Sequence, residues 1–488
     1  MPDTALNWMK RRDLALLTDF YELTMLYGFW KNGRHKQKAC FEYFFRELPP
    51  HTGFALFAGL EQVLDYIRNF SFREEDLTYL KESGFPGEFL AYLRDFHLEL
   101  DLWAVSEGTV VFPCEPLVRV EGSLASAQLL ETFLLNALNY PTLVATKTAR
   151  ICYAAEGDPV MEFGLRRAQG PDGGMAGTRA AFIGGCTGTS NTLAGRLFGI
   201  PVRGTHAHSW VMSFESELEA FRAYVEAFPE HPVLLVDTYD PLMSGIPNAV
   251  QVFQELREKG RTVRGAIRLD SGDLAKLSKE AWRLFRQAGF SDPMIIGSNE
   301  LEEDLIADLK RQKAKVNSWG VGTHLITSKD YPALGGVYKI VAVEGKNGWE
   351  PKIKTSGNIS KITDPGCKQV VRYHLPSGAP LADLLYLEGE KVQKKRIKAY
   401  DRENIIKEVS FSAGDGAPLL QKVVEKGKIL KTPEPLGEIR KRAAANLSAL
   451  AEEYRRLRYP QTYNVLLSPG TARVKQKLLE KAGFYGPL

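Results

Sequence analysis

The middle of the chain alternates short apolar runs with longer amphipathic segments. Seven short apolar or extended runs each end in a polar or glycine-rich cluster, at 160–163, 180–183, 200–202, 233–236, 264–267, 294–296 and 316–319. Successive clusters are about 20–33 residues apart, and helical patterns fill most of the gaps, at 217–227, 249–259, 274–288 and 301–312. This alternation predicts a parallel α/β arrangement, and seven clusters favour an irregular TIM-like α/β barrel over an open sheet.

The segments on either side lack this rhythm. Helical patterns cover 13–35, 73–97 and 124–138, with β-type runs at 39–48 and 102–121. From about residue 335 β-type runs return, and an apolar stripe predicts a helix over 436–458. The sequence therefore predicts an N-terminal α+β domain at 1–150, a catalytic α/β barrel domain at 151–335, and a C-terminal region at 336–488 that partly returns to the N-terminal domain.

Composition and charge limit the kinds of partner that we expect. The chain has 488 residues, of which 44% are hydrophobic and 25% charged, the mixture of an ordinary globular protein. Its 63 basic and 59 acidic residues leave a formal charge of +4. This balance argues against binding by bulk electrostatics, so we expect neither a nucleic acid nor a membrane surface as partner. The sequence also lacks an apolar run of about 18 residues, so we expect no membrane span.

The cysteines bear on the redox compartment. Five of them are widely spaced, at 40, 114, 152, 186 and 367, and no C-x-x-C motif occurs. This pattern argues against a disulfide scaffold and against a structural zinc site. It favours a reducing compartment, and we therefore expect a cytoplasmic protein.

The polar residues at the predicted strand ends suit anions and sugars. Common motifs such as the P-loop, H-E-x-x-H, G-x-S-x-G and a Rossmann fingerprint are absent. Arg166 and Arg268 carry fork-shaped guanidinium groups that pair with phosphate. The segment 320–323 offers backbone N–H groups near a predicted helix start, and Asp237 and Asp270 offer carboxylates to ribose hydroxyls or Mg²⁺. The pattern favours a phosphorylated sugar as the substrate. A sugar diphosphate bound with a metal ion also fits these groups.

Two histidines, His206 and His208, lie in one glycine-led segment after a predicted strand. Because the chain leaves the strand here, we expect only one of them to face the site. Such a histidine can act as general base, metal ligand or phosphate acceptor. Each candidate residue also has a structural alternative: packing for His208, barrel core for Phe163, a helix face for Tyr21, and helix capping for Asp237 and Asp270.

Eight short segments, in order along the chain, resemble the nicotinate phosphoribosyltransferases of the type II phosphoribosyltransferase group. They are Leu17–Met25, Glu162–Ala168, Gly204–Ser209, Val236–Tyr239, Ile267–Asp273, Gly320–Thr323, Gly335–Lys339 and Lys361–Gln369. Any one of them is a weak signal, whereas eight in order are highly specific. The matches thin out after residue 400.

The resemblance implies a reaction. Nicotinate would attack C1 of 5-phosphoribosyl 1-diphosphate, giving nicotinate mononucleotide and diphosphate, in NAD biosynthesis or salvage. ATP hydrolysis would be coupled through a phosphohistidine at His208, and His206 stands where the family tolerates other residues. Mg²⁺ is the implied cofactor, with unassigned ligands, and ATP the implied co-substrate. The transition state is oxocarbenium-like, so arginines and Mg²⁺ facing the leaving diphosphate would supply most of the catalysis.

The resemblance also implies substrate contacts. Phe163 and Tyr21 would enclose the pyridine ring, with Tyr21 coming from the neighbouring subunit of a homodimer that shares its active sites. Arg268 and Asp270 would hold phosphate and ribose hydroxyls and, with His208, form the catalytic set. The other predicted substrate-binding residues are Arg166 at the diphosphate, Gly322 and Thr323 at the 5-phosphate, and Thr205 and Asp237.

One segment bears on the choice between acid and amide. Relatives that use nicotinamide carry an acidic residue in the segment that corresponds to 188–192, whereas this chain has Ser190 and Asn191 there. An aspartate would accept from an amide but repel a carboxylate, and either Ser190 or Asn191 can donate to a carboxylate. The residues therefore favour nicotinate. The alternatives are an enzyme that uses nicotinamide or quinolinate, and a non-catalytic barrel that serves as a binding protein.

Overall fold

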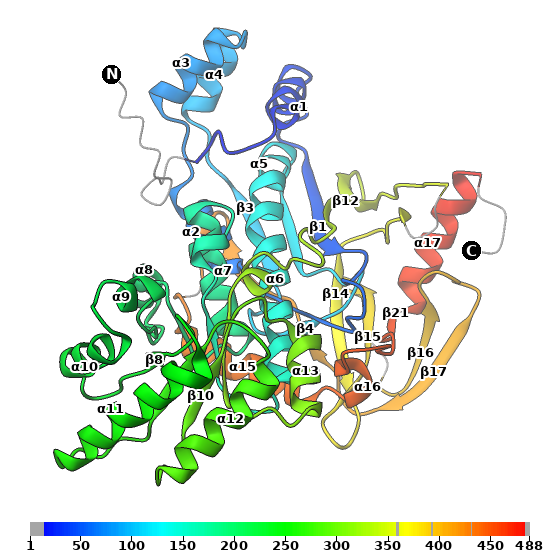
Figure 1. Ribbon diagram of the computed structural model, residues 1–488. Coiled ribbons are helices and arrows are strands. Elements are labelled where there is room, and N and C mark those ends of the chain that lie inside the picture. The colour runs from blue at the N-terminus through cyan, green and yellow to red at the C-terminus, as the bar shows by residue number, and fades with distance from the viewer. Residues whose placement is uncertain (1–13, 358–360, 392–393, 431, 484–488) are drawn as a thin grey trace. The chain divides into compact units, whose positions relative to one another are not determined.

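The computed structural model describes residues 14–357, 361–391, 394–430 and 432–483 (Figure 1). The chain forms two compact units. Unit 1 groups the described residues of Met1–Leu143 with those of Ala333–Leu488, and unit 2 is Val144–Pro332. The sequence predicts three successive parts, of which the last partly returns to the first, and the structure groups the first and the last in one unit.

Unit 2 is built on a six-stranded parallel sheet in the order β7-β6-β11-β10-β9-β8. The strands are β6 (Val160–Glu162), β7 (Gly188–Thr189), β8 (Leu234–Leu235), β9 (Ala266–Leu269), β10 (Met294–Gly297) and β11 (Ser318–Val321). Their residues are almost all buried, as expected of parallel strands covered on both faces. Parallel pairing places the carboxyl ends of these strands at one edge of the sheet.

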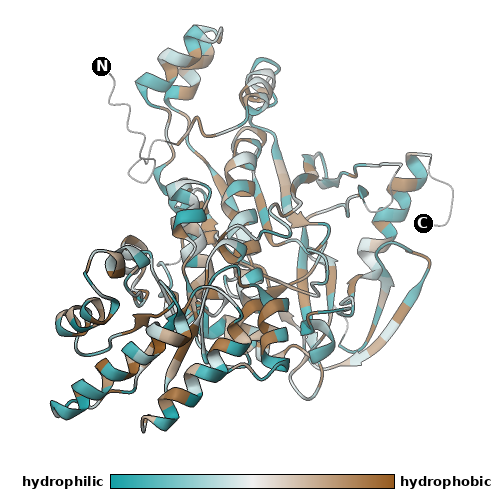
Figure 2. Cartoon of the chain, viewed as in Figure 1, coloured by the Kyte–Doolittle hydropathy of each residue, from teal (hydrophilic) through white to brown (hydrophobic). Residues whose placement is uncertain are grey.

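Helices follow most of these strands, and the predicted βα rhythm is confirmed. The helical elements of unit 2 are η2 (Leu165–Arg167), α7 (Gly170–Gly184), α8 (Thr192–Phe198), α9 (His208–Met212), α10 (Glu217–Ala227), η3 (Pro241–Gly245), α11 (Ile246–Glu258), α12 (Leu274–Gln287), α13 (Glu303–Arg311) and α14 (Thr323–Ile326). Apolar and polar residues alternate along α11 and α12 (Figure 2). Val252, Phe253 and Leu256 are the buried positions toward the end of α11.

One predicted strand is wrong. Residues 180–183 were expected to be extended, but they form the last turn of α7. Pro171 lies in the first turn of α7, where its missing N–H costs nothing, and Gly185 ends the helix with a φ of 123°. A short apolar run does not distinguish a buried strand from a buried helix turn, and the proline and glycine around it decide the outcome here.

The sheet of unit 2 is not closed by backbone hydrogen bonds within the described residues. Val202 extends one edge through an isolated parallel bridge to Thr189, and β8 forms the other edge. Between these edges the Leu235 N–H donates to the ring Nε2 of His206 at 3.1 Å. The parallel α/β arrangement is therefore confirmed, while closure into the expected irregular TIM-like barrel is not: at the edge strand β8 the Leu235 N–H bonds a histidine side chain and not a further strand.

Unit 1 contains a seven-stranded sheet that joins both ends of the chain. Its order is β13 (Gly348–Pro351), β12 (Gly336–Gly345), β1 (Lys38–Phe45), β5 (Val118–Ser123), β3 (Leu100–Ala104), β19 (Gln421–Glu425) and β20 (Lys428–Ile429). The C-terminal strands β12 and β19 pair antiparallel with the N-terminal strands β1 and β3. Hydrogen bonds between strands far apart in sequence therefore make the two terminal parts one unit.

A second sheet and several helices complete unit 1. The sheet has the order β17 (Glu408–Ala413), β16 (Lys395–Asp401), β21 (Val465–Leu467), β15 (Pro380–Leu387), β14 (Lys368–His374) and β18 (Ala417–Pro418), and β2 (Ala55–Leu56) pairs with β4 (Val110–Val111). The helices are α1 (Phe20–Lys31), α2 (Leu60–Asn69), α3 (Glu74–Glu82), α4 (Gly87–Arg94), α5 (Leu124–Leu129), α15 (Leu436–Ala449), α16 (Glu452–Arg455) and α17 (Pro469–Lys481), with α6 (Glu131–Ala154) running from unit 1 into unit 2. No helix within the described residues is long and apolar enough to cross a membrane.

A buried ion pair in the C-terminal part of unit 1 also bonds the backbone of the N-terminal part. Arg372 on β14 donates from Nε and Nη2 to Asp383 on β15, at 2.9 and 2.5 Å, and from Nη1 to the carbonyl of Val110 at 2.7 Å. The Tyr463 hydroxyl donates to Asp383 Oδ1 at 3.0 Å. Burial alone would raise the pKa of Asp383, but the guanidinium and these hydrogen bonds lower it. The charge of Asp383 is therefore compensated inside the protein.

We expect Asp383→Asn to lower the free energy of unfolding by about 3–5 kcal/mol, because the buried Arg372 guanidinium loses its bidentate partner and keeps only Glu115, whose Oε1 lies 3.7 Å from Nη2. The matched control is Asp415→Asn, which breaks an ion pair with Lys394 whose side chains are 76% and 78% exposed. That control is expected to change stability by less than about 0.5 kcal/mol. Urea unfolding of both variants checks the difference, and equal losses would contradict it.

Candidate active site

The side chain of Arg268, on β9, connects the ends of several strands in unit 2. Its Nε donates to Ser298 Oγ at 2.8 Å, and its Nη2 donates to Asp270 Oδ1 at 2.7 Å. Its Nη1 donates to Thr205 Oγ1 at 3.3 Å, and its guanidinium lies 5.7 Å from the centre of the Phe163 ring. These bonds fix a partly exposed cation at the carboxyl edge of the sheet, where it can pair with phosphate.

The carboxylate of Asp237, just after β8, is a second centre of the same edge. Its Oδ2 accepts from the Asp270 N–H and from Ser271 Oγ, both at 2.7 Å. Its Oδ1 lies 3.2 Å from His208 Nε2; the Asp237 side chain is completely buried, and 42% of the His208 side chain is exposed. With Nε2 as the donor to Asp237, His208 Nδ1 carries the lone pair, which makes Nδ1 the nucleophilic nitrogen.

His206 has a different environment. It is 7% exposed, its Nε2 accepts from the Leu235 N–H, and its ring lies 4.7 Å from the Tyr224 ring in an edge-on arrangement. Burial lowers the pKa of His206 to about 4. The ring is therefore neutral at pH 7 and acts as a structural acceptor, in keeping with the expectation that only one of the two histidines faces the site.

Two glycines make room for Phe163 and the turn after it. The Phe163 N–H donates to the Val321 carbonyl at 2.8 Å, so the residue continues from β6 beside β11. A Cβ at Gly320 would come within 2.7 Å of the Phe163 ring, and one at Gly322 would lie 3.2 Å from the Phe163 carbonyl oxygen. Thr323 follows as the first residue of α14, with its hydroxyl donating to Glu300 at 3.2 Å.

The structure separates the roles of Ser190 and Asn191. Asn191 is 2% exposed and caps α8: its Oδ1 accepts from the Ala194 N–H at 3.2 Å, and its Nδ2 donates to Thr178 Oγ1 at 3.2 Å. Ser190 is exposed beside it. Of the two candidate donors to a substrate carboxylate, Ser190 therefore has the accessible side chain.

Arg166 and Tyr21 are both surface residues within their own units. Arg166 lies in the short helix η2 of unit 2 and is exposed. Tyr21 lies on α1 of unit 1 and is 45% exposed, and burial together with the nearby carboxylates Glu131 and Glu22 raises its pKa to about 12. Exposure leaves both side chains available to a ligand or to another chain.

Sequence reasoning gave no role to Ser298, Ser271 or Glu162, which the structure places in the hydrogen-bond network of this edge. Ser298 is 1% exposed and its Oγ bonds both Arg268 and Asp270. Glu162 is 1% exposed and ends β6. All three residues lie within or next to the polar segments at the predicted strand ends. That position is the only feature of the sequence that indicates a place in the site.

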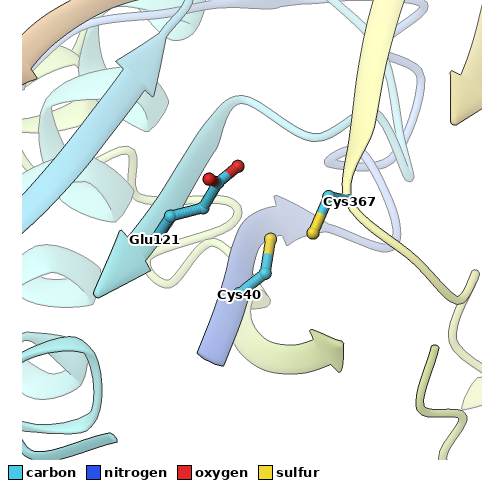
Figure 3. A group of neighbouring side chains, drawn as sticks. All are labelled: Cys40, Glu121 and Cys367. Carbon is cyan, nitrogen blue, oxygen red and sulfur yellow. The ribbon is translucent and has the colours of Figure 1, made fainter. Parts of the chain in front are cut away.

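Among the described residues, one group of three neighbouring side chains in unit 1 could offer ligands to a metal ion. Cys40, Glu121 and Cys367 point toward one another there (Figure 3). Burial and the neighbouring Cys367 raise the pKa of the Cys40 thiol, and the Arg119 Nε lies 2.9 Å from Glu121. Two thiols and an ion-paired carboxylate do not suit Mg²⁺, which prefers oxygen ligands and substrate phosphates. We interpret the group as a packed pair of free thiols.

Unit 1 also contains a cavity of about 900 Å³. Its lining mixes acidic, basic and aromatic side chains, including Asp101, Lys426 and Trp349, and holds none of the predicted site residues. The converging hydrogen bonds of Arg268, Asp237 and His208 locate the candidate site better than volume does, because they present charged and nucleophilic groups together.

Fold and site together define an α/β protein that gathers an arginine, carboxylates and a histidine at the ends of parallel strands. Residues 16–139, 159–370 and 367–475 match the N-terminal domain, the family as a whole and the C-terminal domain of nicotinate phosphoribosyltransferase, respectively. The chain belongs to the nicotinate phosphoribosyltransferase family.

Individual relatives agree with this assignment. The chain is 44% identical to nicotinate phosphoribosyltransferase of Bacillus subtilis over 467 residues, which covers 94% of each chain. It is 36% identical to the human protein of that name, over 93% of this chain and 94% of the relative. The crystal structure of human nicotinic acid phosphoribosyltransferase superimposes with a TM-score of 0.84 and 34% identity, over 94% of this chain and 99% of that one.

The lowered pKa of His206 makes the stability of the protein depend on pH. In the unfolded chain this histidine has a pKa of about 6.5, so between pH 6.5 and 4 the unfolded state binds more protons and stability falls as the pH falls. His206→Gln keeps an acceptor for the Leu235 N–H and removes the titration. We expect its melting temperature to fall less than that of the wild type between pH 7.5 and 5.

The control for this measurement is His231→Gln, which changes an exposed histidine of the same unit. Its acid sensitivity should equal that of the wild type. If His206→Gln lost as much thermal stability on acidification as the wild type does, the neutral structural role of His206 would be wrong.

Proposed function

We propose that this protein transfers a phosphoribosyl group from 5-phosphoribosyl 1-diphosphate to nicotinate, giving nicotinate mononucleotide and diphosphate. The observation that carries the proposal is the network of Arg268, Asp270, Asp237 and His208 at the strand ends of a member of this family. It brings a fixed cation, a hydroxyl acceptor and an oriented histidine to one edge. The product is a precursor of the pyridine nucleotides, so the reaction belongs to NAD biosynthesis.

The transfer itself needs positioning and charge more than proton chemistry. As the bond from C1 to the diphosphate oxygen lengthens, positive charge builds on the ribosyl ring and negative charge on the diphosphate. Arg268 and Arg166 are assigned to the phosphate groups, and Asp270 Oδ2 to the ribose hydroxyls. The backbone N–H groups of Gly322 and Thr323 are assigned to the 5-phosphate. Nicotinate nitrogen then attacks C1, and the diphosphate leaves with the electron pair of the broken bond.

The pairing of His208 with Asp237 supports a role in ATP coupling. His208 Nδ1 would attack the γ-phosphorus of ATP, forming an N–P bond while ADP leaves, and water would later hydrolyse the phosphohistidine. Asp237 stabilises the imidazolium that forms, because its buried carboxylate lies 3.2 Å from Nε2. The new phosphate would bring negative charge to the strand edge that also carries Arg268, which would change the affinity of the site for its substrates.

Mg²⁺ fits this scheme as an ion carried mainly by substrate phosphates. The nearby carboxylates of Asp237 and Asp270 already bond protein donors, so they offer at most one or two ligands. When bound, the ion would neutralise charge on the diphosphate and on ATP.

The pyridine ring is assigned to the face of Phe163, with Tyr21 from a neighbouring copy on the other side. Phe163 is held by its backbone bond to Val321 and by the space that Gly320 provides. Tyr21 is exposed on α1, where a second chain can reach it. Ser190, the accessible hydroxyl, would donate to the nicotinate carboxylate, and we infer a homodimer with shared sites.

Turnover assays with purified protein test the function directly. Nicotinate, nicotinamide and quinolinate are each supplied with 5-phosphoribosyl 1-diphosphate, with and without ATP, and mononucleotide formation is measured. We expect product from nicotinate and a higher rate with ATP. If the protein converts only nicotinamide or only quinolinate, that compound and not nicotinate is its substrate. If it converts none of the three, a non-catalytic binding protein is favoured.

We expect His208→Ala to abolish ATP coupling while leaving a slow transfer, because the phosphate acceptor is lost but the groups that bind the sugar remain. Labelled ATP should leave phosphate on the wild type and none on the variant. The matched control, His231→Ala, removes an exposed histidine of unit 2 and should label normally. Continued stoichiometric ATP consumption by His208→Ala would contradict the phosphohistidine assignment.

We expect Asp270→Ala to lower kcat/KM for 5-phosphoribosyl 1-diphosphate by roughly 100-fold, because the ribose acceptor and the counter-ion of Arg268 are both lost. Phosphorylation of His208 by ATP should fall much less. Asp292→Ala, at a carboxylate whose side chain is 72% exposed, serves as the control. Equal loss of both activities in Asp270→Ala would count against the ribose role.

A further inference from the structure

Glu162 is a buried carboxylate at the end of β6 that the proposed chemistry does not use. Its Oε1 accepts from the Gly164 N–H, and its Oε2 accepts from Thr178 Oγ1 at 3.0 Å and Thr189 Oγ1 at 2.6 Å. All three donors are uncharged. Burial raises the pKa of Glu162, and the three hydrogen bonds offset part of that rise. A carboxylate placed here costs desolvation, so its three acceptor contacts require an explanation.

The donors belong to the two segments that carry the ring-binding candidates. Gly164 lies directly after Phe163, at the start of the turn that leads to Arg166. Thr189 lies directly before Ser190, and its hydroxyl also accepts from the Asn191 N–H at 2.9 Å. The Ser190 N–H donates to the backbone carbonyl of Glu162 at 3.0 Å. One residue thus bonds both segments, through its side chain and its backbone.

We propose that Glu162 is a positioning residue that holds the Phe163 turn and the Ser190 segment at the spacing that the pyridine ring and its carboxylate require. The inference rests on the proposed function, since it assigns the ring to these two segments. Glu162 does not touch substrate in this scheme. It acts through the backbone of Gly164 and the hydroxyl of Thr189, and its effect should appear in the use of nicotinate and not in the use of the sugar donor.

The chemistry of the acceptor explains why a carboxylate is needed. The two carboxylate oxygens accept from the Gly164 N–H and the Thr189 hydroxyl and share the Thr178 hydroxyl with the Gly174 carbonyl, which lies 2.7 Å from it. A glutamine offers one acceptor oxygen and an NH₂ group that only donates. In Glu162→Gln the oxygen must face the Gly164 N–H, because that group cannot accept. The NH₂ then faces Thr178 and Thr189, whose hydroxyls must turn. The Ser190 segment therefore exchanges a bond to a charged acceptor for a weaker neutral one and keeps only its backbone bond to Glu162 unchanged, while the Phe163 turn keeps its own bond.

The first experiment measures KM for each substrate in Glu162→Gln. We expect KM for nicotinate to rise by about tenfold, the effect of losing one good hydrogen bond to a charged acceptor, and KM for 5-phosphoribosyl 1-diphosphate to stay within about twofold. The matched control is Glu217→Gln, at a buried carboxylate that accepts from Ser244 and Asn248, also uncharged donors of unit 2. That control should leave both KM values unchanged.

Thr189→Val tests the same contact from the other side and keeps the test decisive if Glu162→Gln fails to fold. It removes the hydroxyl at nearly constant shape and should also raise KM for nicotinate selectively. If both variants fold, the double variant should cost less than the sum of the single ones, because they break one shared interaction. Thermal melting establishes which variants are folded.

The outcomes separate the two proposals. If the wild type turns over nicotinate but the folded variants show unchanged KM values, or equal rises for both substrates, the positioning role is overturned and the proposed function stands. If the wild type does not turn over nicotinate, the function fails and this inference fails with it. A rise confined to nicotinate, in Thr189→Val and in Glu162→Gln where it folds, supports the role of Glu162.

Discussion

The buried carboxylate of Asp237 is the interaction on which the candidate site depends. It accepts hydrogen bonds from the Asp270 backbone and the Ser271 hydroxyl through one oxygen and faces His208 through the other. These partners come from the end of β9 and from the start of α9. Without the charge of Asp237, the loop that carries Asp270 and the ring of His208 would lose a common acceptor. A low-dielectric surrounding makes such bonds strong when complete and costly when broken.

Other buried polar side chains also need hydrogen-bond or charge partners, and each obtains them in a different way. Asp383 in unit 1 is compensated by the Arg372 guanidinium, and its role is to join strands. Glu162 in unit 2 is bonded by a backbone N–H and two hydroxyls. His206 is kept neutral and accepts from the edge strand β8. These three buried groups each hold together segments whose spacing the hydrophobic core alone would leave undefined.

Much of unit 2 follows from periodicity, and the exceptions have identifiable causes. The helices α10 to α13 begin and end within a few residues of their predicted limits, because each carries one continuous apolar stripe. Residues 180–183 were assigned to a strand because four apolar residues fit either element. In unit 1, strand pairs such as β1 with β12 join residues about 300 positions apart, for example Ala39 and Val343, and no local pattern encodes that pairing.

The sequence by itself determined the family, the alternation of strands and helices, and the kinds of side chain found at the strand ends. The tertiary structure decided which of these side chains meet. Arg268 bonds the hydroxyl of Thr205, 63 positions earlier, and that of Ser298, 30 positions later. Of two adjacent candidates, Asn191 caps a helix while Ser190 is exposed. The reason is that contacts between parallel strands are non-local: their geometry depends on register and on the direction of each side chain, which a linear pattern of residue types does not contain.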